Sequence, residues 1–302
     1  MRAIVTGGAG FIGSNLVDAL LERGDEVHVL DDLSSGKREN VDERATLHVG
    51  DIRADADPAL DAARPEIVFH LAAQADVRVS VARPDFDADV NVLGTIRVLE
   101  AARRHGAKVV FSSTGGAIYG ECDGPAPEDR PLEPLAPYGT SKLAGEEYLS
   151  TWNRLYGTSH VALRFANVYG PRQQPHLEAG VVAIFMGLLR GGGQPQIFGD
   201  GMQTRDYVYV GDVVRACLAS LDADGSVFNV GTGVETSVND LYARIRDVTG
   251  SETEAVYADA RLGELQRVVV DPARAERDLG WAAEVSLVDG LGLTWRAMTD
   301  AA

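Results

Sequence analysis

A glycine-rich turn near the start of the chain constrains the fold more than any other feature. Residues 2–6 are apolar and predict a short buried strand, and residues 11–23 have the apolar spacing of a helix. Between them lie Gly7, Gly10 and Gly13. In such a place the first glycine permits a tight turn, the second lets the backbone approach a pyrophosphate, and the third lets the helix pack closely on the strand. The turn therefore predicts a dinucleotide-binding βαβ unit with the anion at the helix N-terminus.

Strand and helix patterns continue to alternate after this turn. Further strands are expected at 26–30, 47–49, 67–71 and 109–112, and the longest helical patterns cover 85–105 and 138–156. Such alternation is typical of a parallel sheet with helices on both faces. We expect an α/β fold in which residues 1–166 form a Rossmann-like, doubly wound parallel sheet. Residues 167–302 should form mainly a smaller, mixed α/β substrate domain, with residues 206–232 folding back onto the first domain.

Composition argues against several classes of protein. The 302 residues carry a formal net charge of −17, which disfavours a nucleic-acid partner because phosphate binding needs a basic surface. No apolar run approaches the roughly 18 residues of a membrane span, and the first strand begins at once, so neither a membrane segment nor a signal peptide is expected. Two distant cysteines and scattered histidines favour a reducing cytoplasm and no metal site. The scarcity of lysine fits both a GC-rich genome and a salt-adapted cytoplasm.

Two carboxylates follow the second predicted strand. Asp31 and Asp32 lie 18 and 19 residues beyond Gly13. A carboxylate there can accept hydrogen bonds from the adenosine ribose and would repel a 2′-phosphate, so the pair favours NAD over NADP. The alternative is that both are ordinary turn residues.

A tyrosine and a lysine on one helix face indicate chemistry at an alcohol. Tyr138 and Lys142 are four residues apart. A free tyrosine has a pKa of about 10, and a nearby ammonium and a cationic nicotinamide would both favour the phenolate of a general base. Ser112, Ser113 and Thr114 end a strand upstream and are expected at the carboxyl edge of the sheet, where such folds bind ligands. A solvated helix face and hydroxyls that only cap backbone groups are the alternative interpretations.

Taken in order, these motifs resemble those of the extended short-chain dehydrogenase/reductases. The shared segments are GGAGFIG at 7–13, HLAA at 70–73, Ser113-Thr114, Tyr138-x3-Lys142 and RFANVYGP at 164–171. The segments GDGMQTRDY at 199–207 and RLGE at 261–264 are most similar to NAD-dependent nucleotide-sugar epimerases of the UDP-glucose 4-epimerase type. This resemblance implies C4 epimerisation of a UDP-hexose through a transient 4-keto sugar. The hexose would be glucose or galactose, or one of their N-acetyl forms. The alternatives are another nucleotide-sugar dehydrogenase, reductase or epimerase, and a non-catalytic NAD-binding regulator.

The resemblance also implies roles for individual residues. Thr114 would hydrogen-bond the sugar hydroxyl being oxidised, Tyr138 would take its proton, and Lys142 would bind the nicotinamide ribose and lower the tyrosine pKa. Ser113 is the alternative to Thr114. NAD would contact Tyr138, Lys142 and the residues Gly7, Gly10, Phe11, Ile12, Gly13, Asp31, Asp32, Ser34, Ser35, Gly36, Asp51, Ile52, Leu71, Ala72, Ala73, Gln74, Ser112 and Ser113. The UDP-sugar would contact Thr114, Asn167, Val182, Gln196, Ile197, Phe198, Arg205, Arg261 and Val268, with Val268 beside the substituent at sugar C2.

Two further expectations follow from the same patterns. Sugar 4,6-dehydratases of this family carry Asp-Glu directly after the catalytic threonine, whereas Gly115 and Gly116 stand there in this chain, so elimination of water is not expected. The helices expected at 85–105 and 138–156 are apolar over a wide arc, which favours a second partner and, with the resemblance, a homodimer. The alternative is that both helices are buried by their own sheet.

Overall fold

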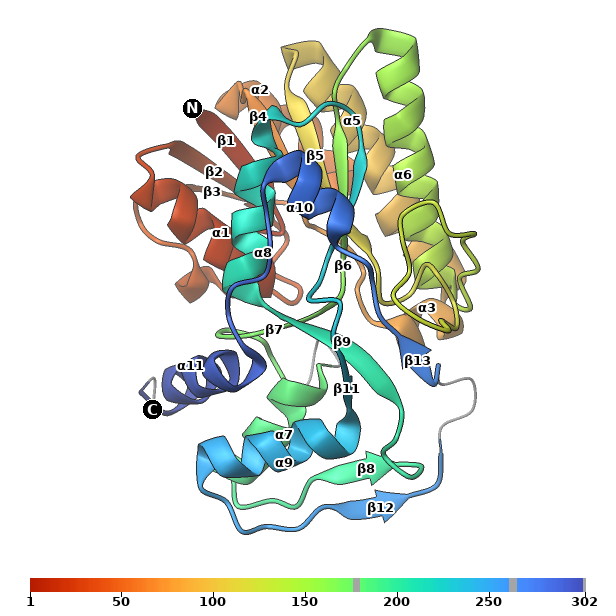
Figure 1. Cartoon of the computed structure of the whole chain (residues 1–302). Coiled ribbons are helices and arrows are strands. Elements are labelled where there is room, and N and C mark those ends of the chain that lie inside the picture. Colours follow the sequence, from red (N-terminus) through yellow and green to blue (C-terminus); the bar gives the residue numbers. More distant parts are fainter. Residues whose placement is uncertain (176–179, 261–264, 301–302) are drawn as a thin grey trace.

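A parallel sheet of seven strands forms the centre of the computed structural model, which describes residues 1–175, 180–260 and 265–300 (Figure 1). The strand order is β10-β6-β5-β4-β1-β2-β3, and each neighbouring pair is parallel. The bounds are β1 (Arg2–Thr6), β2 (Glu26–Asp31), β3 (Thr46–Val49), β4 (Ile67–His70), β5 (Lys108–Thr114), β6 (Val161–Phe165) and β10 (Val227–Val230). The chain winds outward in both directions from β1 and β4, which confirms the expected Rossmann-like, doubly wound α/β fold.

The two faces of this sheet carry separate apolar cores. On β1, Ala3 and Val5 enter one core and Ile4 enters the other, because successive side chains of a strand point to opposite faces. The first core includes residues of α1 (Phe11–Glu22), α8 (Val210–Ala219) and α10 (Ala273–Leu279). The second includes residues of α2 (Ile52–Ala63), α5 (Gly94–His105) and α6 (Pro137–Tyr156). A strand that is apolar at nearly every position, such as β1, is what a sheet covered on both faces requires.

The helix expected at 85–105 is present, and its first half contains a widened, π-helical turn. The structure has a short α4 (Pro84–Ala88), a π-helical segment η2 (Asp89–Leu93) and then α5, preceded by the short α3 (Val77–Ala82). At the π-helical turn the Asn91 amide donates to the Gln74 carbonyl oxygen at 2.9 Å, and the Thr95 hydroxyl donates to the Asn91 carbonyl oxygen at 2.6 Å. These contacts accompany the widened turn, and π-helical turns of this kind are frequent at functional sites.

A smaller lobe lies below the main sheet in the view of Figure 1. Its larger sheet contains β11-β9-β13, with β7 also paired to β9, and β8 pairs with β12. A third apolar core joins β7, β8 and β9 to three helices. None of the helices in residues 1–175, 180–260 and 265–300 is long and apolar enough to cross a membrane. The bounds of the lobe's elements are β7 (Asn167–Tyr169), α7 (Val181–Arg190), β8 (Gln196–Phe198), β9 (Thr204–Tyr209), β11 (Glu235–Ser237), α9 (Val238–Thr249), β12 (Val256–Ala258), β13 (Arg267–Val268) and α11 (Leu287–Asp300).

Two segments of the later sequence pack against the N-terminal part of the chain. Strand β10 pairs with β6, with Val227 opposite Ala162, and so extends the main sheet. Helix α8 follows β9 directly and packs against α1. The short 3₁₀ turns η1 (Arg38–Asn40) and η3 (Ser220–Asp222) complete the described elements.

Candidate active site

The site is expected where the chain changes winding direction in the main sheet. Strands β1 and β4 are neighbours, but β2 and β3 continue to one side and β5 and β6 to the other. The loops that follow such strands diverge and leave a crevice at the carboxyl edge, where ligands of α/β proteins bind. The glycine turn follows β1, Asp31 ends β2, the HLAA segment follows β4, and the hydroxyl cluster ends β5. The fold therefore brings these separate segments to one edge.

The glycine turn is packed so tightly that side chains have no room. Gly7 has a φ of 72°, and a Cβ on Gly7 would lie 2.7 Å from the Ala72 backbone nitrogen. A Cβ on Gly13 would lie 2.1 Å from the Gly7 carbonyl oxygen. Gly10 is the N-cap of α1 and supplies no side-chain cap, so the first amides of the helix remain available to an anion. Phe11 and Ile12 form the first turn of α1.

The two aspartates after β2 have different surroundings. Asp31 is 7% exposed, and its carboxylate accepts hydrogen bonds from the Ala9 backbone nitrogen at 2.9 Å and the Leu33 backbone nitrogen at 2.8 Å. Burial raises the pKa of Asp31, and these backbone hydrogen bonds oppose the rise. Asp32 is exposed and accepts from the Ser34 backbone nitrogen at 2.9 Å. Asp31 thus joins the glycine turn to the next loop, while Asp32 shapes that loop.

The other residues expected around the adenosine flank the same loops. Ser35 is exposed, and a Cβ on Gly36 would lie 2.9 Å from Ala9, so this loop lies against the glycine turn. Asp51 caps α2 and accepts from the backbone nitrogen two residues on at 2.8 Å. Ile52 is 5% exposed and belongs to the second core.

The segment after β4 lies against the glycine turn and then turns towards α4. Leu71 and Ala73 are partly buried, and the Ala72 backbone nitrogen donates to the Thr6 hydroxyl at 3.2 Å. The Gln74 side chain donates to a carboxylate on α4 at 2.9 Å. This segment therefore connects the expected cofactor crevice to the helices on its far side.

The hydroxyls at the end of β5 have different partners. Ser113 donates to the Glu146 carboxylate, which lies beneath the site on α6. Thr114 is close enough to the phenol of Tyr138 to lower its pKa. Adjacent residues of a strand face opposite sides, so these two hydroxyls cannot both face the phenol. The geometry favours Thr114 over Ser113 as the hydroxyl that acts with Tyr138.

Tyr138 and Lys142 begin α6 and face the end of β5. Tyr138 is half-buried, and Lys142 is only 3% exposed. The Lys142 ammonium donates to the Ser112 carbonyl oxygen at 2.9 Å and lies 4.9 Å from the centre of the Phe111 ring. The Ser112 hydroxyl itself donates to a carbonyl oxygen of β4 at 3.1 Å. The lysine is therefore anchored to the strand that presents Thr114.

The charge states of this pair depend on burial and on a carboxylate that sequence analysis missed. Burial and, to a smaller extent, Asp87 raise the pKa of Tyr138 to about 12, while Thr114 opposes the rise. Burial lowers the pKa of Lys142 to about 8, while Asp87 and Glu146 raise it. The expectation that Lys142 lowers the tyrosine pKa remains a prediction. The protein itself thus holds the phenol neutral near pH 7.

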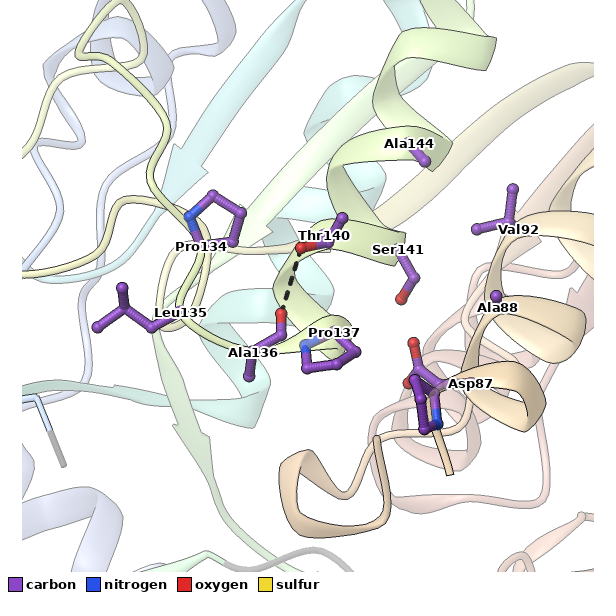
Figure 2. A pocket seen from close by; sticks show the side chains of 11 residues that line it. Asp87, Ala88, Val92, Pro134, Leu135, Ala136, Pro137, Thr140, Ser141 and Ala144 are labelled. Carbon is purple, nitrogen blue, oxygen red and sulfur yellow. Dashed lines mark hydrogen bonds between the residues drawn. The ribbon is translucent and has the colours of Figure 1, made fainter. Parts of the chain in front are cut away.

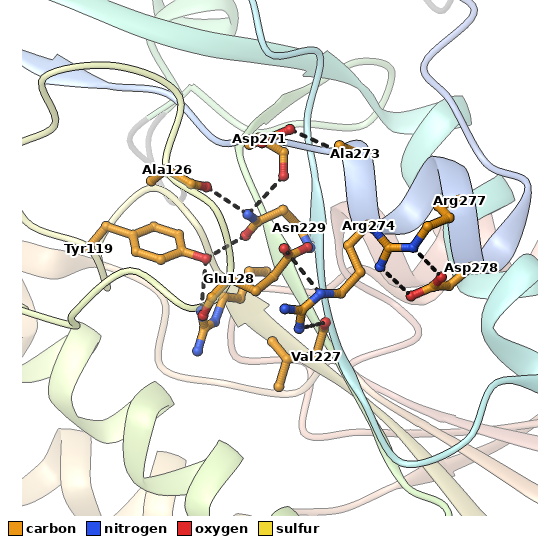
Figure 3. Close-up of polar contacts among 11 residues, drawn as sticks. Tyr119, Ala126, Glu128, Val227, Asn229, Asp271, Ala273, Arg274, Arg277 and Asp278 are labelled. Carbon is orange, nitrogen blue, oxygen red and sulfur yellow. Dashed lines mark hydrogen bonds and ion pairs between the residues drawn. The ribbon is translucent and has the colours of Figure 1, made fainter.

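A buried ion pair supports β5 from behind. The Arg164 guanidinium donates to the Glu146 carboxylate at 2.9 and 2.7 Å and to the Tyr119 phenol oxygen at 2.8 Å. Tyr119 donates to the Asn229 side-chain oxygen at 2.7 Å, and the Asn229 backbone nitrogen donates to Glu128 at 2.8 Å (Figure 3). The network joins α6 and β6 to β10 and the loop after β5. Arg164 lies within one of the sequence motifs, but spacing offered no signal of its partner on α6.

Three of the residues expected to bind the UDP-sugar lie in the small lobe's larger sheet. Asn167 is on β7, and Arg205 on β9 pairs with Val268 on β13. A Cβ on Gly116 would lie 3.5 Å from the Asn167 side-chain oxygen and 3.8 Å from the Thr114 hydroxyl. Asn167 is therefore close to the end of β5.

The remaining sugar-binding candidates are not gathered at that point. Val182 and Ile197 are each 1% exposed and belong to the third core. On either side of Ile197, Gln196 is exposed and Phe198 is half-buried. Arg261 lies outside the described residues.

Comparison with known proteins gives independent evidence for the family to which the chain belongs. Residues 3–231 match the model of the NAD dependent epimerase/dehydratase family. A UDP-glucose 4-epimerase of Mycolicibacterium smegmatis is 48% identical over 97% of both chains. The chain superposes with a TM-score of 0.97 on a UDP-glucose 4-epimerase from Thermotoga maritima solved with UDP-glucose, at 46% identity, covering 100% of this chain and 99% of that one. The TM-score is 0.96 for a Thermus thermophilus UDP-glucose 4-epimerase in complex with NAD, at 44% identity and 100% coverage of both chains.

Proposed function

Because the chain belongs to the NAD-dependent epimerase/dehydratase family, we propose that it is an NAD-dependent UDP-glucose 4-epimerase. It interconverts UDP-glucose and UDP-galactose through a 4-keto sugar. The observation that carries this proposal is that Thr114, Tyr138 and Lys142 lie together at the carboxyl edge of the sheet, where Thr114 lowers the pKa of the phenol and the Lys142 ammonium binds the Ser112 carbonyl oxygen. The assignment of the nucleotide and the sugar in this proposal is based on the relatives named above.

The glycine turn and its neighbours fit NAD. At Gly7 and Gly13 a Cβ would collide with backbone, so the turn presents only main-chain groups to a pyrophosphate at the N-terminus of α1. Asp31 ends β2 beside this turn, where a carboxylate accepts from ribose hydroxyls and repels a 2′-phosphate. When bound there, NAD would supply reversible hydride transfer at sugar C4, with no net redox change over the reaction.

Three residues do the protein's part of the chemistry. Tyr138 takes the proton from the sugar 4-hydroxyl as a general base. It later returns a proton to the same oxygen, as a general acid, when the 4-keto group is reduced. Thr114 hydrogen-bonds the same oxygen and directs it to the phenol. Lys142 binds the nicotinamide ribose and, as a cation anchored to Ser112, stabilises negative charge on the phenol oxygen.

The small lobe is proposed to bind the UDP-sugar. Asn167 lies near Thr114, and Arg205 lies on the neighbouring β9, where a guanidinium suits an anionic diphosphate. Val268, at the position paired with Arg205, is proposed to border the substituent at sugar C2.

The residues after Thr114 favour epimerisation over elimination of water. A Cβ on Gly115 would lie 2.6 Å from a methyl carbon of Val270, so an acidic side chain does not fit there without displacing Val270. The 4,6-dehydratases need their acidic pair at this place. A simple dehydrogenase or reductase differs because it would consume NAD or its reduced form in proportion to product.

The test is turnover without added cofactor. The purified protein is incubated with UDP-galactose, and the formation of UDP-glucose is followed together with the bound NAD content. Tyr138→Phe should lower the rate by about 10²–10⁴-fold while leaving NAD bound, since only the phenol oxygen is lost. Tyr148→Phe, an exposed change on the same helix, is the matched control. Activity of Tyr138→Phe within tenfold of the parent would remove the tyrosine as the base.

We also propose that the enzyme is a cytoplasmic homodimer of carbohydrate metabolism. Leu93, Leu155 and Tyr156 are 53%, 64% and 45% exposed on η2 and α6, and apolar side chains this exposed favour a partner surface. Cys122 and Cys217 are both free and buried, which suits a reducing compartment. Light scattering at micromolar concentration should report twice the chain mass, and a monomer would end the dimer proposal.

A further inference from the structure

A buried carboxylate beside the site has no role in the chemistry described so far. Asp87 on α4 is 1% exposed, whereas Asp85 on the same helix is exposed. One Asp87 oxygen accepts from the Gln74 side chain at 2.9 Å and from the Asn91 side chain at 3.1 Å. Its other oxygen is buried and has no hydrogen-bond partner among the described residues. A carboxylate buried with half of its acceptors unused is costly unless a nearby positive charge compensates it.

The contacts of Asp87 lead directly to the catalytic helix. Figure 2 shows Asp87 and Ser141 on facing walls of a pocket of about 450 Å³ between α4 and α6. The Asn91 side chain joins them, because it donates to Asp87 and also to the Ser141 hydroxyl at 3.2 Å. The same amide group exchanges two hydrogen bonds with the Gln74 backbone, at 2.8 and 2.9 Å. Asp87 is thus tied both to the loop after β4 and to the residue that precedes Lys142.

Several other charges around Asp87 have partners of opposite sign or an aromatic contact, and Asp85 is exposed to solvent. Carboxylates on neighbouring elements are paired with arginines, and Arg83 lies over the Phe86 ring at 4.5 Å. Tyr138 and Lys142 lie on α6, which packs against α4, and Asp87 raises the pKa of both. The paired carboxylates are Asp76 with Arg78, Asp89 with Arg53, and Glu146 with Arg164. Lys142 is a buried cation on α6 whose ammonium donates to a carbonyl oxygen and forms no ion pair among the described residues, so it can compensate Asp87.

We propose that Asp87 is a positioning residue of the epimerase, whose buried carboxylate keeps Lys142 protonated and holds the Gln74 loop against the catalytic helix. This role rests on the proposed function, since it assigns Lys142 its cationic task there. Burial alone favours the neutral amine, and a neutral amine cannot stabilise negative charge on the phenol oxygen. The negative charge of Asp87 opposes that loss of a proton. The same charge disfavours the phenolate, so Asp87 moves the titrations of both groups to higher pH.

The test reads Lys142 directly and does not depend on turnover. The chain contains only three lysines, Lys37, Lys108 and Lys142, so lysine labelled at the ε-carbon gives few NMR signals, and Lys142→Met assigns the relevant one. In the parent this signal should titrate near pH 8. In Asp87→Asn, whose side-chain oxygen can still accept from Gln74, the midpoint should fall by roughly one pH unit. Lys37 and Lys108 serve as internal references.

Matched variants separate charge from structure. Asp85→Asn removes a charge from the exposed side of the same helix, and Asp87→Glu keeps the buried charge; both should leave the Lys142 midpoint near that of the parent. Both limbs of the pH profile of kcat/KM should move to lower pH in Asp87→Asn, whereas a purely structural role would lower activity equally at every pH. Asp87→Ser replaces Asp87→Asn if thermal unfolding shows that the latter does not fold.

Two outcomes overturn the proposal. The first is a Lys142 midpoint that stays at the parent value in the folded, neutral variant. The second is an equal fall in Asp85→Asn, which would show a general effect of surface charge. Failure of the epimerase assignment would give a different result. The parent would then not convert UDP-galactose, while the lysine titration could still be measured.

Discussion

Replacing Arg164 by methionine should strongly destabilise the protein, because it leaves the Glu146 carboxylate buried without its cation. Arg164 and Glu146 are 4% and 6% exposed, and two guanidinium nitrogens donate to the carboxylate at 2.9 and 2.7 Å. Methionine preserves much of the apolar stem of arginine. The charge and the hydrogen-bond donors are therefore what the change removes.

The size of the loss follows from the groups left behind. Removing one partner of a buried ion pair typically costs about 3–5 kcal/mol. The Glu128 carbonyl oxygen also loses a donor at 3.1 Å, while the Tyr119 phenol keeps its bond to Asn229. We expect Arg164→Met to lower the free energy of unfolding by about 4 kcal/mol, roughly a thousandfold in the folding equilibrium. Adding Glu146→Gln removes the buried charge and keeps an acceptor for Ser113, so the double variant should recover about half of this loss.

Urea unfolding, followed by fluorescence at equal NAD content, measures these differences, because a bound ligand adds its own stabilisation. Arg103→Met is the control: its ion pair with Glu100 is solvent-exposed, and it should cost less than about 1 kcal/mol. The reasoning fails if Arg164→Met unfolds within about 1 kcal/mol of the parent. It also fails if the double variant is no more stable than the single one, since the orphaned charge would then not be the cause.

Three further changes probe other parts of the molecule. Gly13→Ala places a methyl group 2.1 Å from the Gly7 carbonyl oxygen, so the purified variant should contain little NAD; calorimetric NAD affinity equal to that of the parent would contradict this. Burial lowers the pKa of His70 to about 3, so between about pH 6.5 and 3 the unfolded chain binds a proton that the native state does not, and stability falls as pH falls. In the parent, this effect should lower the free energy of unfolding by about 2 kcal/mol between about pH 7 and 5, and His70→Gln should abolish that part of the loss. If the unfolding free energy of the variant depends on pH as the parent's does, His70 does not have this role. The parent should accept UDP-N-acetylglucosamine beside UDP-glucose, and Val268→Tyr should lower kcat/KM for the N-acetyl sugar selectively; equal effects on both sugars would show that Val268 is not the gate.

Features of the chain that depend on local spacing could be predicted from the sequence. The apolar run at 2–6, the turn at 7–13 and the helix that follows are contiguous, and their geometry is set by backbone conformation and by the space that glycine leaves. The same holds for Tyr138 and Lys142, which share a face because they are one helical turn apart. The alternation of strands and helices then sufficed for the doubly wound sheet.

Contacts between distant segments decided what spacing could not. The π-helical turn at 89–93 accompanies a contact between Asn91 and Gln74, 17 residues apart, and the apolar periodicity of the sequence could not predict such a contact. The separate surroundings of Ser113 and Thr114 depend on Glu146, which lies beneath β5 only because α6 packs there.

The charge states of the site residues show most clearly the difference between what the sequence predicts and what only the tertiary structure decides. Sequence identified a phenol and an ammonium near each other, but the pKa of each depends on how deeply it is buried and on which charges face it. Asp87 is one acidic residue among many in the sequence, and only packing leaves it buried while Asp85 remains in solvent. Local spacing thus determined which groups the chain can present on one element. The tertiary structure determined their charge, because the energy of a buried charge depends on neighbours contributed by other elements.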